Sequence, residues 1–341
     1  TVLYNIVENM DQSHFEPLVL GLFENGRVGD RLRALNVRTE CLGMSKPYSP
    51  FTIAKFIPIF AKYVKKNEIA IIHSLLTASG IYGGIVAKCM GIHSILNVHA
   101  PMNKGRIRHL ESLSRKLNDT LIPGNRITER ELEQTVSHKN SRLIYNGIKP
   151  EGKAEVRSFG DRTVKITMVA NFFAEKDHMT LLRAFEQLME KRPVHLQFVA
   201  DGNNEYRDRV VSYIAEKKLD NVELQRTRVP DLYTKETDIF VLASHAEGLP
   251  ISVTEAMSAG LPVVASDVGA MNEIIDHRQN GILVPAESVA DLTGALDELI
   301  EDEALRRRLG ENARQKFEAK FTMASMAAAY DDLYASVAVS G

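Results

Sequence analysis

The chain has 341 residues, 44% of them hydrophobic and 25% charged, and this composition excludes a disordered or fibrous protein. At about 150 residues per domain, the length is sufficient for two domains. The formal net charge of -2 argues against a general polyanion-binding protein, so no nucleic-acid partner is expected. The charge is unevenly divided: residues 1–149 hold 20 Lys and Arg against 12 Asp and Glu (net +8), and residues 150–341 hold 22 against 32 (net -10).

Cysteine content and the start of the chain bear on its location. Cys41 and Cys89 are too few for a disulfide framework, and neither belongs to a Cys-x-x-Cys pair, as is typical of a reducing compartment. The first residues lack the basic segment and apolar core of a signal peptide. The apolar stretch at residues 69–92 contains polar residues and four glycines, which indicates a buried strand and a small-residue helix. We expect a soluble cytoplasmic protein, either free or peripheral at the inner face of the membrane.

The predicted elements begin with a helix at residues 1–9, which is followed by a strand at residues 15–20. A doubly wound α/β domain opens with a strand and a glycine-rich turn, so the sequence predicts that the first strand of the first domain is missing. Continuous apolar strands are typical of a parallel sheet that helices cover on both faces, and the expected fold class is therefore α/β. The apolar runs of strand length are residues 69–72, 95–98, 164–169, 196–199, 239–242 and 262–265.

A break in the alternation of strands and helices suggests two domains. After Asn146-Gly147-Ile148-Lys149-Pro150, a polar stretch with little apolar periodicity extends to Thr163. Three amphipathic helices are predicted near the end of the chain, at residues 287–300, 302–319 and 323–337. The predicted organisation is a first domain at 1–148, a linker at 149–162, a second domain at 163–320 and a final helical segment at 321–341.

The most informative segment begins at Glu247, in a loop that follows a predicted strand. A helix is expected to begin near Pro250 and to end at Gly260. Backbone N–H groups at the start of a helix have no partner within the helix, so the residues around Gly248 form a candidate site for an anionic or hydroxyl-rich ligand. Glu255 lies about one turn into the helix, roughly 8–10 Å from Glu247 at 1.5 Å per residue. This separation suits the two ends of one extended ligand.

The residues around the two glutamates resemble a known family. The Glu-x7-Glu spacing, with Gly-Leu-Pro after the first Glu and Ala-Met-x-x-Gly-x-Pro-Val-Val-Ala-Ser-Asp after the second, resembles the retaining glycosyltransferases of family 4 (glycosyl transferases group 1). The likeness continues in residues 146–148, 169–177, 268–275 and 280–285. It implies the GT-B architecture, in which two facing Rossmann-like domains have a cleft between them. It also implies that the final helix crosses back to the first domain.

The resemblance implies roles for residues of the second domain. Lys176 would neutralise the diphosphate of a nucleotide-sugar donor in place of a metal ion, and Glu255 would bind the ribose hydroxyls. Glu247, with the backbone amides of Gly248 and Leu249, would contact the transferred sugar. The other expected donor-binding residues are Pro250, Asn171, Gly202 and Ser252.

The chemistry of such a transfer needs few groups. A sugar–phosphate bond breaks through an oxocarbenium-like state, so the main task is to stabilise negative charge on the departing diphosphate. One lysine and a helix N-terminus can do this. The sequence has no His-Glu-x-x-His motif, Cys-x-x-Cys pair or Asp-x-Asp cluster, so we expect no metal and no cofactor. The donor is a substrate, with a UDP-sugar favoured over a GDP-sugar.

The first domain holds the residues expected to meet the acceptor. His99 ends a strand, and the resemblance places it near the donor sugar and the acceptor as a catalytic residue. His73 and Ser74 end another strand, and Lys104 and Arg106 lie in a basic loop; all four are candidate acceptor-binding residues. Structural interpretations stay open for each, because a histidine at a strand end is often a satisfied structural residue and a basic loop is often a solvated turn.

Several positions depart from the family pattern. Ala170-Asn171 stands where the family has Gly-Arg, so a second cation for the diphosphate is missing, and Arg226 or Arg228 could replace it. Ser244-His245 stands in place of Ser-Arg, and Ala200-Asp201-Gly202 in place of Gly-Asp-Gly. We also expect the glycine-rich loop, which normally helps to hold phosphate and acceptor, to be missing together with the first strand.

The sequence therefore predicts a retaining, metal-independent glycosyltransferase that moves a hexose to a sugar hydroxyl of a glycan or lipid-linked acceptor, in cell-surface polysaccharide biosynthesis. The basic first domain suits an anionic acceptor or peripheral contact with an anionic membrane. Two alternatives stay open. One is a non-catalytic nucleotide-sugar-binding or scaffold protein, which Asn171 and the missing opening segment favour. The other is a nucleotide-sugar epimerase of the same fold.

Overall fold

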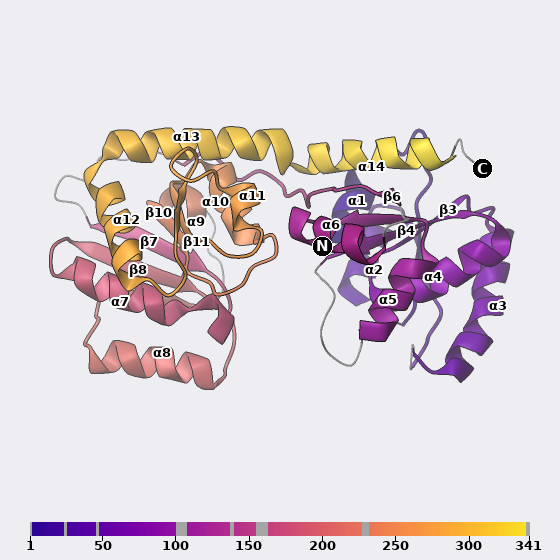
Figure 1. Ribbon diagram of the computed structural model, residues 1–341, viewed down its shortest axis with the longest axis horizontal. Helices are drawn as coiled ribbons and strands as arrows, with labels where there is room; N and C mark the ends of the chain where they lie inside the picture. Colours follow the sequence, from indigo (N-terminus) through magenta and orange to yellow (C-terminus); the bar gives the residue numbers. More distant parts are fainter. Residues whose placement is uncertain are drawn as a thin grey trace. The chain divides into compact units, whose positions relative to one another are not determined.

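The computed structural model describes residues 2–23, 26–45, 48–99, 108–136, 140–154, 163–226 and 232–338. Its helices and strands fall into two units (Figure 1). Unit 1 consists of Thr1–Gly147 together with Met323–Gly341, and unit 2 consists of Ile148–Thr322. Each unit has its own parallel sheets and its own helices.

Unit 1 alternates helices and strands along most of its length. Its elements are α1 (Val2–Asn9), β1 (Leu18–Gly21), α2 (Gly26–Ala34), β2 (Arg38–Cys41), α3 (Pro50–Lys66), β3 (Ile71–Ser74), α4 (Thr77–Met90), β4 (His93–Val98), α5 (Arg108–Leu117), β5 (Thr120–Pro123), α6 (Arg126–Thr135), β6 (Asn140–Ser141) and α14 (Met323–Ala338). The described strands form a two-stranded parallel sheet, β1-β2, and a four-stranded parallel sheet, β3-β4-β5-β6.

Helices cover both faces of the four-stranded sheet. Successive residues of a strand point to opposite faces, so the neighbours Ile95 and Leu96 of β4 belong to separate apolar clusters. The cluster around Ile95 includes Ile6 of α1 and four side chains of α14. The cluster around Leu96 includes Leu132 of α6. The adjacent apolar residues Ile95 and Leu96 of β4 are explained by this double covering.

Unit 2 is built on one six-stranded sheet. Its elements are β7 (Val164–Val169), the 3-10 helix η1 (Ala174–Lys176), α7 (His178–Met189), β8 (Val194–Val199), α8 (Glu205–Glu216), β9 (Val222–Gln225), α9 (Leu232–Lys235), β10 (Ile239–Leu242), α10 (Ile251–Ala259), β11 (Val263–Ser266), α11 (Met271–Ile274), β12 (Ile282–Val284), α12 (Val289–Glu301) and α13 (Glu303–Lys320). All strand pairs are parallel, in the order β12-β11-β10-β7-β8-β9.

The strand order of unit 2 reverses between β7 and β10. From β7 the chain proceeds to β8 and β9 on one side, and it then returns to place β10, β11 and β12 on the other side. Because all six strands are parallel, their carboxyl ends meet at one edge of the sheet. In open parallel sheets, ligands bind outside the carboxyl ends at the point where the order reverses. The loops after β7 and β10 therefore occupy the expected position of a binding site.

Most predicted elements are confirmed, with small shifts at their starts. The strands predicted at 164–169 and 239–242 are β7 and β10, and the three helices predicted near the end of the chain are α12, α13 and α14. Two strands begin more than one residue later than predicted. The amide of Phe15 bonds within a turn, which delays β1, and the amide of Ile69 bonds back to α3, which delays β3.

The predicted linker at 149–162 is described only as far as Ala154. In that part, the amide of Glu151 donates to the hydroxyl of Ser258 at 3.0 Å, and the amide of Ala154 donates to the carbonyl of Ala259 at 2.7 Å. These residues therefore lie against the end of α10 and belong structurally to unit 2.

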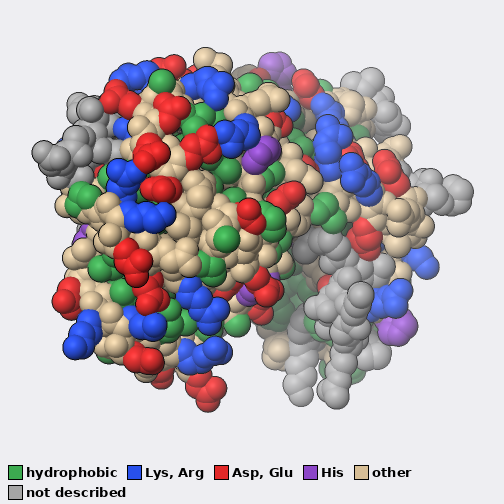
Figure 2. All heavy atoms as spheres, turned by 60° about the vertical axis from the view of Figure 1, so that its left-hand side comes forward, with side chains coloured by type: hydrophobic (Ala, Val, Ile, Leu, Met, Phe, Trp, Pro, Cys, Tyr) green, Lys and Arg blue, Asp and Glu red, His purple; other side chains and the backbone are tan. Residues whose placement is uncertain are grey.

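No helix in the described part of the chain is both long enough and apolar enough to cross a membrane. On the face shown in Figure 2, which is turned so that the side carrying α7, α8 and α12 in Figure 1 comes forward, acidic and basic side chains are interspersed. The excess of acidic residues in the second half of the chain is therefore not gathered into one patch on this face.

Candidate functional site

Two side chains of opposite charge meet where the strand order of unit 2 reverses. Lys176 follows β7 at the end of η1, and Glu247 lies in the loop after β10. Lys176 Nζ is 2.7 Å from Glu247 Oε1, and the hydroxyl of Ser244 donates to the same oxygen at 2.7 Å. The Glu247 side chain is 6% exposed and the Lys176 side chain 27%, so the lysine is the more accessible partner. The structure thus brings together two of the three residues that the sequence predicts to be catalytic.

His245 joins the loop after β10 to the turn after β7. Its backbone amide donates to the carbonyl of Glu175 at 2.8 Å. Its ring nitrogens lie 3.7 Å from the carboxylate of Asp177, which caps α7, and 3.2 Å from the carboxylate of Glu287. The residue that stands in place of the family's arginine therefore holds the two loops of the site together.

Gly269 allows another loop to pass directly beside Glu247. Its φ of +56° is in the left-handed region, which favours glycine. A Cβ atom built on Gly269 would lie 1.8 Å from the carbonyl oxygen of Glu247, well inside any acceptable contact. The close approach of the two backbones requires a glycine, and it fixes the Glu247 loop from the side of β11.

The N-terminus of α10 is open. α7, α8, α12 and α13, the other described helices of unit 2 with at least eight residues, each begin with a side chain that accepts a backbone amide. α10 begins after Pro250, and no described side chain caps it. Its first amides are therefore left for another acceptor, at the positive end of the helix dipole. Gly248 and Leu249 precede this end, and Ser252 lies in its first turn, where the sequence predicts donor-binding residues.

Glu255 is fixed one turn further along α10. The hydroxyl of Tyr233, in α9, donates to Glu255 Oε2 at 2.9 Å. The tyrosine is 1% exposed, whereas Glu255 is partly exposed. A buried tyrosine that orients a partly exposed carboxylate leaves that carboxylate able to accept hydrogen bonds from a ligand.

The loops after β7 and β8 contact each other. Asn171 is exposed, and its side-chain oxygen accepts a hydrogen bond from the amide of Asp201 at 3.3 Å. Gly202, which follows, has a φ of +123°. The two predicted donor-binding residues Asn171 and Gly202 therefore lie in adjoining loops. Asn171 contributes no positive charge, so the family's second cation is missing at its usual position.

Arg226 does not restore that cation at the same place. It follows β9, and its guanidinium donates to the side-chain oxygen of Asn203, in the loop after β8, at 2.8 Å. Strands in a sheet lie about 4.8 Å apart, so the end of β9 is roughly 10 Å from the end of β7. Arg228, the other residue considered as a replacement, lies outside the described residues.

The strand ends of unit 1 carry polar side chains that bond to α14. Asn97 donates through its amide nitrogen to the hydroxyl of Tyr330 (2.7 Å), so its oxygen accepts from His73 Nε2 (2.5 Å). His73 Nδ1 then accepts from the hydroxyl of Tyr334 at 2.7 Å. Burial lowers the pKa of His73 to about 4 and raises that of Tyr330 to about 12.

This network bears on the acceptor-binding roles predicted for the strand ends. Both ring nitrogens of His73 are used within the protein, and the hydroxyl of Ser74 donates to a backbone carbonyl of α4 at 3.0 Å. The two residues hold α14 and the start of α4. Their roles as acceptor ligands stay predictions that this geometry does not favour.

His99 differs from His73 in its exposure. It directly follows β4, is exposed, and bonds to the backbone of Leu75. With residues of α4 and α5 it lines a pocket of about 180 Å³ in unit 1. Its catalytic role stays a prediction. Lys104 and Arg106, the other candidate acceptor-binding residues, lie outside the described residues.

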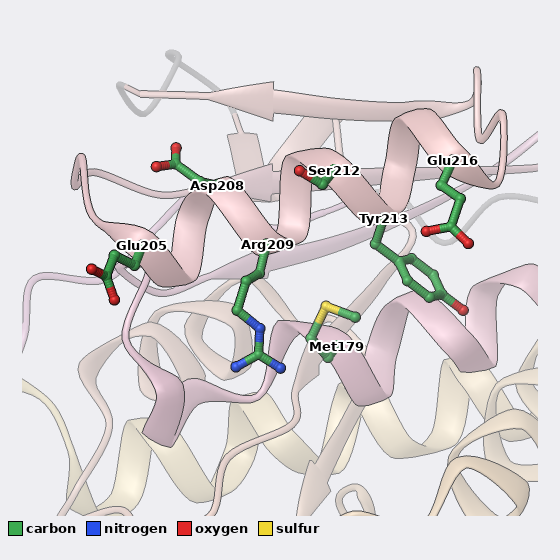
Figure 3. Close-up of a pocket in the computed structure, with 7 residues that line it drawn as sticks. All are labelled: Met179, Glu205, Asp208, Arg209, Ser212, Tyr213 and Glu216. Atoms are coloured by element: carbon green, nitrogen blue, oxygen red, sulfur yellow. The ribbon is translucent and has the colours of Figure 1, made fainter.

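A larger pocket, of about 420 Å³, lies between α7 and α8 (Figure 3). Most of its lining side chains come from α8, and Met179 of α7 contributes from the other side. Three of the lining residues are the carboxylates Glu205, Asp208 and Glu216. Carboxylates repel a diphosphate, so this pocket is unsuited to the predicted donor.

Within the described ranges, no three His, Cys, Asp or Glu side chains lie close enough together to hold a metal ion. That the transfer reaction needs no metal ion stays a prediction from the sequence.

Some residues of the site were not predicted from the sequence as site residues. Tyr233 carries no sequence signal for a site, because a tyrosine beside an apolar residue is indistinguishable from a core residue. Ser244 belongs to the Ser-His pair that departs from the family pattern, and its hydroxyl has no sequence signal of its own. Gly269 belongs to a segment that resembles the family, and a glycine within that segment was the available signal for a close backbone approach.

Comparison with known proteins relates the chain to glycosyltransferases. Residues 152–316, which lie within unit 2, match the family model described as "Glycosyl transferases group 1". The chain is 26% identical over 339 residues to the UDP-Gal:alpha-D-GlcNAc-diphosphoundecaprenol alpha-1,3-galactosyltransferase of Escherichia coli, with 91% of this chain and 86% of that protein covered. It is 41% identical over 78 residues, 23% of this chain and 21% of the relative, to the N,N'-diacetylbacillosaminyl-diphospho-undecaprenol alpha-1,3-N-acetylgalactosaminyltransferase of Campylobacter jejuni.

Solved structures resemble the whole chain. A glycosyltransferase from Rickettsia africae matches with a TM-score of 0.82 at 17% identity, over 98% of this chain and 94% of that one. Alr3699/HepE of Anabaena, in complex with UDP and glucose, matches with a TM-score of 0.78 at 17% identity, over 98% and 95%. At these identities the likeness establishes the fold, which is the GT-B fold with two Rossmann-like domains.

Proposed function

We propose that the chain is a group 1 glycosyltransferase that transfers a hexose from a nucleotide-diphosphate-sugar to a sugar hydroxyl, with retention of the anomeric configuration and without a metal ion. The observation that carries this proposal is the Lys176–Glu247 pair beside the open N-terminus of α10, at the point where the strand order reverses. This place combines a cation, a carboxylate and unpaired amides at the edge where parallel sheets bind ligands.

The proposed donor position follows from these groups. The diphosphate lies between Lys176 and the first amides of α10, where two sources of positive charge face it. Glu247, held by Ser244, contacts the hydroxyls of the transferred sugar together with the amides of Gly248 and Leu249. The ribose hydroxyls donate to Glu255, one turn along α10.

The proposed role of these residues in catalysis is electrostatic. As the sugar–phosphate bond breaks, negative charge grows on the departing diphosphate, and a positioned ammonium and helix N-terminus stabilise it most at that moment. Lys176 supplies the charge for which other transferases use a metal. His99 of unit 1 is proposed as a further catalytic residue.

Donor and acceptor classes are proposed from the relatives. The Escherichia coli relative is named for UDP-Gal and a diphosphoundecaprenol acceptor, and Alr3699/HepE was solved with UDP and glucose. We therefore favour a UDP-sugar over a GDP-sugar, and a lipid-linked glycan acceptor in cell-surface polysaccharide synthesis. The protein then works in the cytoplasm, at the inner face of an anionic membrane, which suits the basic first half of the chain.

The test begins with the donor. Thermal unfolding of the full chain is followed with UDP-, GDP- and ADP-sugars, because a ligand of the native state raises the melting temperature. Transfer of the stabilising sugar is then measured on a diphosphate-lipid acceptor, with and without a chelator, and NMR gives the anomeric configuration of the product. Retained configuration and chelator-resistant transfer are expected. An inverted product, or loss of transfer with the chelator, would refute the corresponding part of the proposal.

A non-catalytic nucleotide-sugar-binding protein is the second candidate, because the uncharged Asn171 stands where the family has a cation. The same experiment separates the two. Stabilisation by a donor without transfer or donor hydrolysis, over a range of acceptors, would favour the binding protein.

A further inference from the structure

Helix α3 of unit 1 is rich in lysine and contains no carboxylate. Its 17 residues, Pro50–Lys66, include Lys55, Lys62, Lys65 and Lys66 but neither Asp nor Glu. The ion pairs among the described residues of unit 1 involve none of these lysines. An ordinary exposed helix mixes both signs of charge, so this helix leaves four positive charges without a neutralising partner on its own surface.

One face of α3 packs on its own unit. Val64 belongs to an apolar cluster with Ile72 of β3 and Val86 of α4, and Ile57 and Phe60 of α3 pack against that cluster. These α3 positions are three or four residues apart, which is the spacing of a single helix face. The core therefore accounts for this face, and the opposite face points away from unit 1.

The opposite face combines apolar and basic side chains. Phe51, Lys55, Ile59, Lys62 and Lys66 fall within about 80° of one another at 100° per residue, on the side away from the core. Phe51 is 77% exposed and Ile59 45% exposed, and the three lysines are also exposed. We name these five residues the lysine–apolar stripe. Over a helix of this length it extends for roughly 22 Å at 1.5 Å per residue.

We propose that the lysine–apolar stripe docks unit 1 on an anionic lipid membrane. Phe51 and Ile59 enter the boundary between headgroups and acyl chains, and the lysines between and beyond them pair with lipid phosphates. Lysine stems can lie along apolar surface while their ammonium groups stay at the level of the headgroups. The helix lies on the membrane and does not cross it.

The arrangement of the stripe favours lipid over a protein partner. A protein interface has an apolar core with charged residues depleted from it and a polar rim around it. In the stripe, Lys55 instead lies between Phe51 and Ile59, and its ammonium is 5.2 Å from the ring of the adjacent Phe56. In a lipid membrane, phosphate groups and acyl chains lie close together over the whole surface. Single apolar side chains that alternate with cations therefore fit a membrane.

This inference deepens the proposed function, because a lipid-linked acceptor is presented at a membrane. The biological use of the docking rests on the proposed function. The docking itself can be tested alone, since binding to lipid needs neither donor nor acceptor. The chemistry of transfer lies in unit 2 and at His99, and none of the five residues of the stripe belongs to that machinery.

The test is flotation of the full chain with vesicles, in the absence of any nucleotide-sugar. Vesicles of phosphatidylcholine alone are compared with vesicles that also contain phosphatidylglycerol, at low and at high salt. We expect flotation only with the anionic vesicles and loss of flotation at high salt, as surface electrostatics requires. Failure to float with anionic vesicles, or equal flotation with neutral vesicles, would overturn the proposal.

Two variants locate the contact. Lys55→Gln/Lys62→Gln/Lys66→Gln should weaken binding to anionic vesicles by roughly a hundredfold, since each lysine near an anionic surface contributes about fivefold. Phe51→Ser/Ile59→Ser should weaken it by roughly tenfold or more, because the apolar part of the contact is lost. All five side chains are exposed, and unfolding curves that match the parent protein would verify that the fold is intact.

A matched control removes the same charge from elsewhere. Lys88→Gln/Lys116→Gln/Lys153→Gln also changes three exposed lysines, none of them in α3, and should leave flotation within about twofold of the parent. An equal loss in this control would refute the stripe and indicate a diffuse charge effect. Sedimentation velocity without lipid gives a further check: a dimer that Phe51→Ser/Ile59→Ser abolishes would assign the stripe to a second copy of the chain instead.

Two transfer assays distinguish membrane docking from sugar transfer. The lysine variant should keep full transfer to a soluble acceptor analogue while it loses transfer to an acceptor embedded in anionic vesicles. A protein that floats but transfers no sugar would refute the proposed function alone. A protein that transfers sugar but does not float would refute the docking alone.

Discussion

In unit 2 the carboxyl ends of the central strands lead to the partly exposed Lys176–Glu247 pair, whereas in unit 1 the strand ends carry a buried network that includes His73 and Asn97. Both places are rich in polar side chains at the edge of a parallel sheet. In unit 2 the neighbouring helix N-terminus is left open, and in unit 1 two tyrosines of α14 take up the hydrogen bonds. Strand ends can therefore be left open, as at Lys176 and Glu247, or be held by a distant helix, as at His73 and Asn97, although His99 beside them stays exposed.

Substitutions at the two edges should affect different properties of the protein. Changes at the open edge should alter donor binding or transfer and leave the free energy of unfolding nearly unchanged. Changes at the closed edge should alter the free energy of unfolding and leave donor binding unchanged. Each of the following predictions could break this separation.

The largest effect is expected at the open edge. Lys176→Gln removes the positive charge but keeps a hydrogen-bond donor toward Glu247, so the fold should be retained. Transfer should fall by roughly a hundred- to a thousandfold, because one stabilising group for the departing diphosphate is lost. Steady-state kinetics measures this loss.

The control for this prediction is Lys165→Gln. Lys165 is the second residue of β7, the strand that leads to Lys176, and is paired with Glu236 at the opposite edge of the sheet. Its substitution should leave transfer unchanged. If both variants lost activity equally, the role of Lys176 would not depend on its place at the open edge.

A large effect on stability is expected from pH at the closed edge. Burial holds the pKa of His73 at about 4, whereas an unfolded histidine has a pKa of about 6.5. As the pH falls through 6.5, the unfolded chain takes up a proton that folded unit 1 does not accept, so stability is lost progressively down to about pH 4. The loss from this residue should reach about 3 kcal/mol.

Chemical denaturation at several pH values measures this loss. His178 in unit 2 has a pKa of about 4 for the same reason, so the parent protein should show both contributions. His73→Gln should flatten the pH dependence by its own share only. An unchanged pH dependence in this variant would show that the closed edge does not keep His73 neutral.

A moderate effect is expected from one tyrosine of the closed edge. Tyr330→Phe leaves the amide nitrogen of Asn97 without its acceptor in a buried place, which should cost about 1–2 kcal/mol of unfolding free energy. Calorimetric titration should give an unchanged donor affinity. Tyr233→Phe is the matched substitution in unit 2, where the lost hydroxyl orients Glu255, and it should instead weaken donor binding.

The smallest effect is expected at Glu255. Glu255→Gln replaces charge-assisted hydrogen bonds to the ribose by neutral ones, so donor affinity should fall by about tenfold. Titration with UDP and with a deoxyribose analogue of UDP measures it. The parent protein should prefer UDP, and the variant should lose most of this preference. An equal preference for UDP in both proteins would show that Glu255 does not contact the ribose hydroxyls.

Much of the open edge could be predicted because local sequence encodes it. Lys176 and Glu247 each follow an apolar strand, and alternation of strands and helices makes those strands parallel, so their carboxyl ends share an edge. The two motifs around them also resemble one family. The contacts of Gly269 and Tyr233 were not predictable in this way, since each depends on the packing of two loops or helices far apart in the sequence.

The closed edge was less accessible to sequence reasoning. A histidine at a strand end is compatible with both a ligand and a structural role, and nothing near His73 decides between them. The residue that decides is Tyr334, which is 261 positions further along the chain. The acceptor-binding hypothesis for His73 therefore depended on a contact that only the fold displays.

The return of α14 to unit 1 also has a consequence for how the chain is made. Unit 2 is complete at Thr322, and its two ends already meet, because Ile148 pairs with Thr322 and donates to the carbonyl of Phe321 at 2.9 Å. The main core of unit 1 lacks Met326 and Tyr330 until α14 has been synthesised. Unit 2 therefore forms from one continuous stretch of chain, whereas unit 1 is complete only when the last helix joins the first 147 residues.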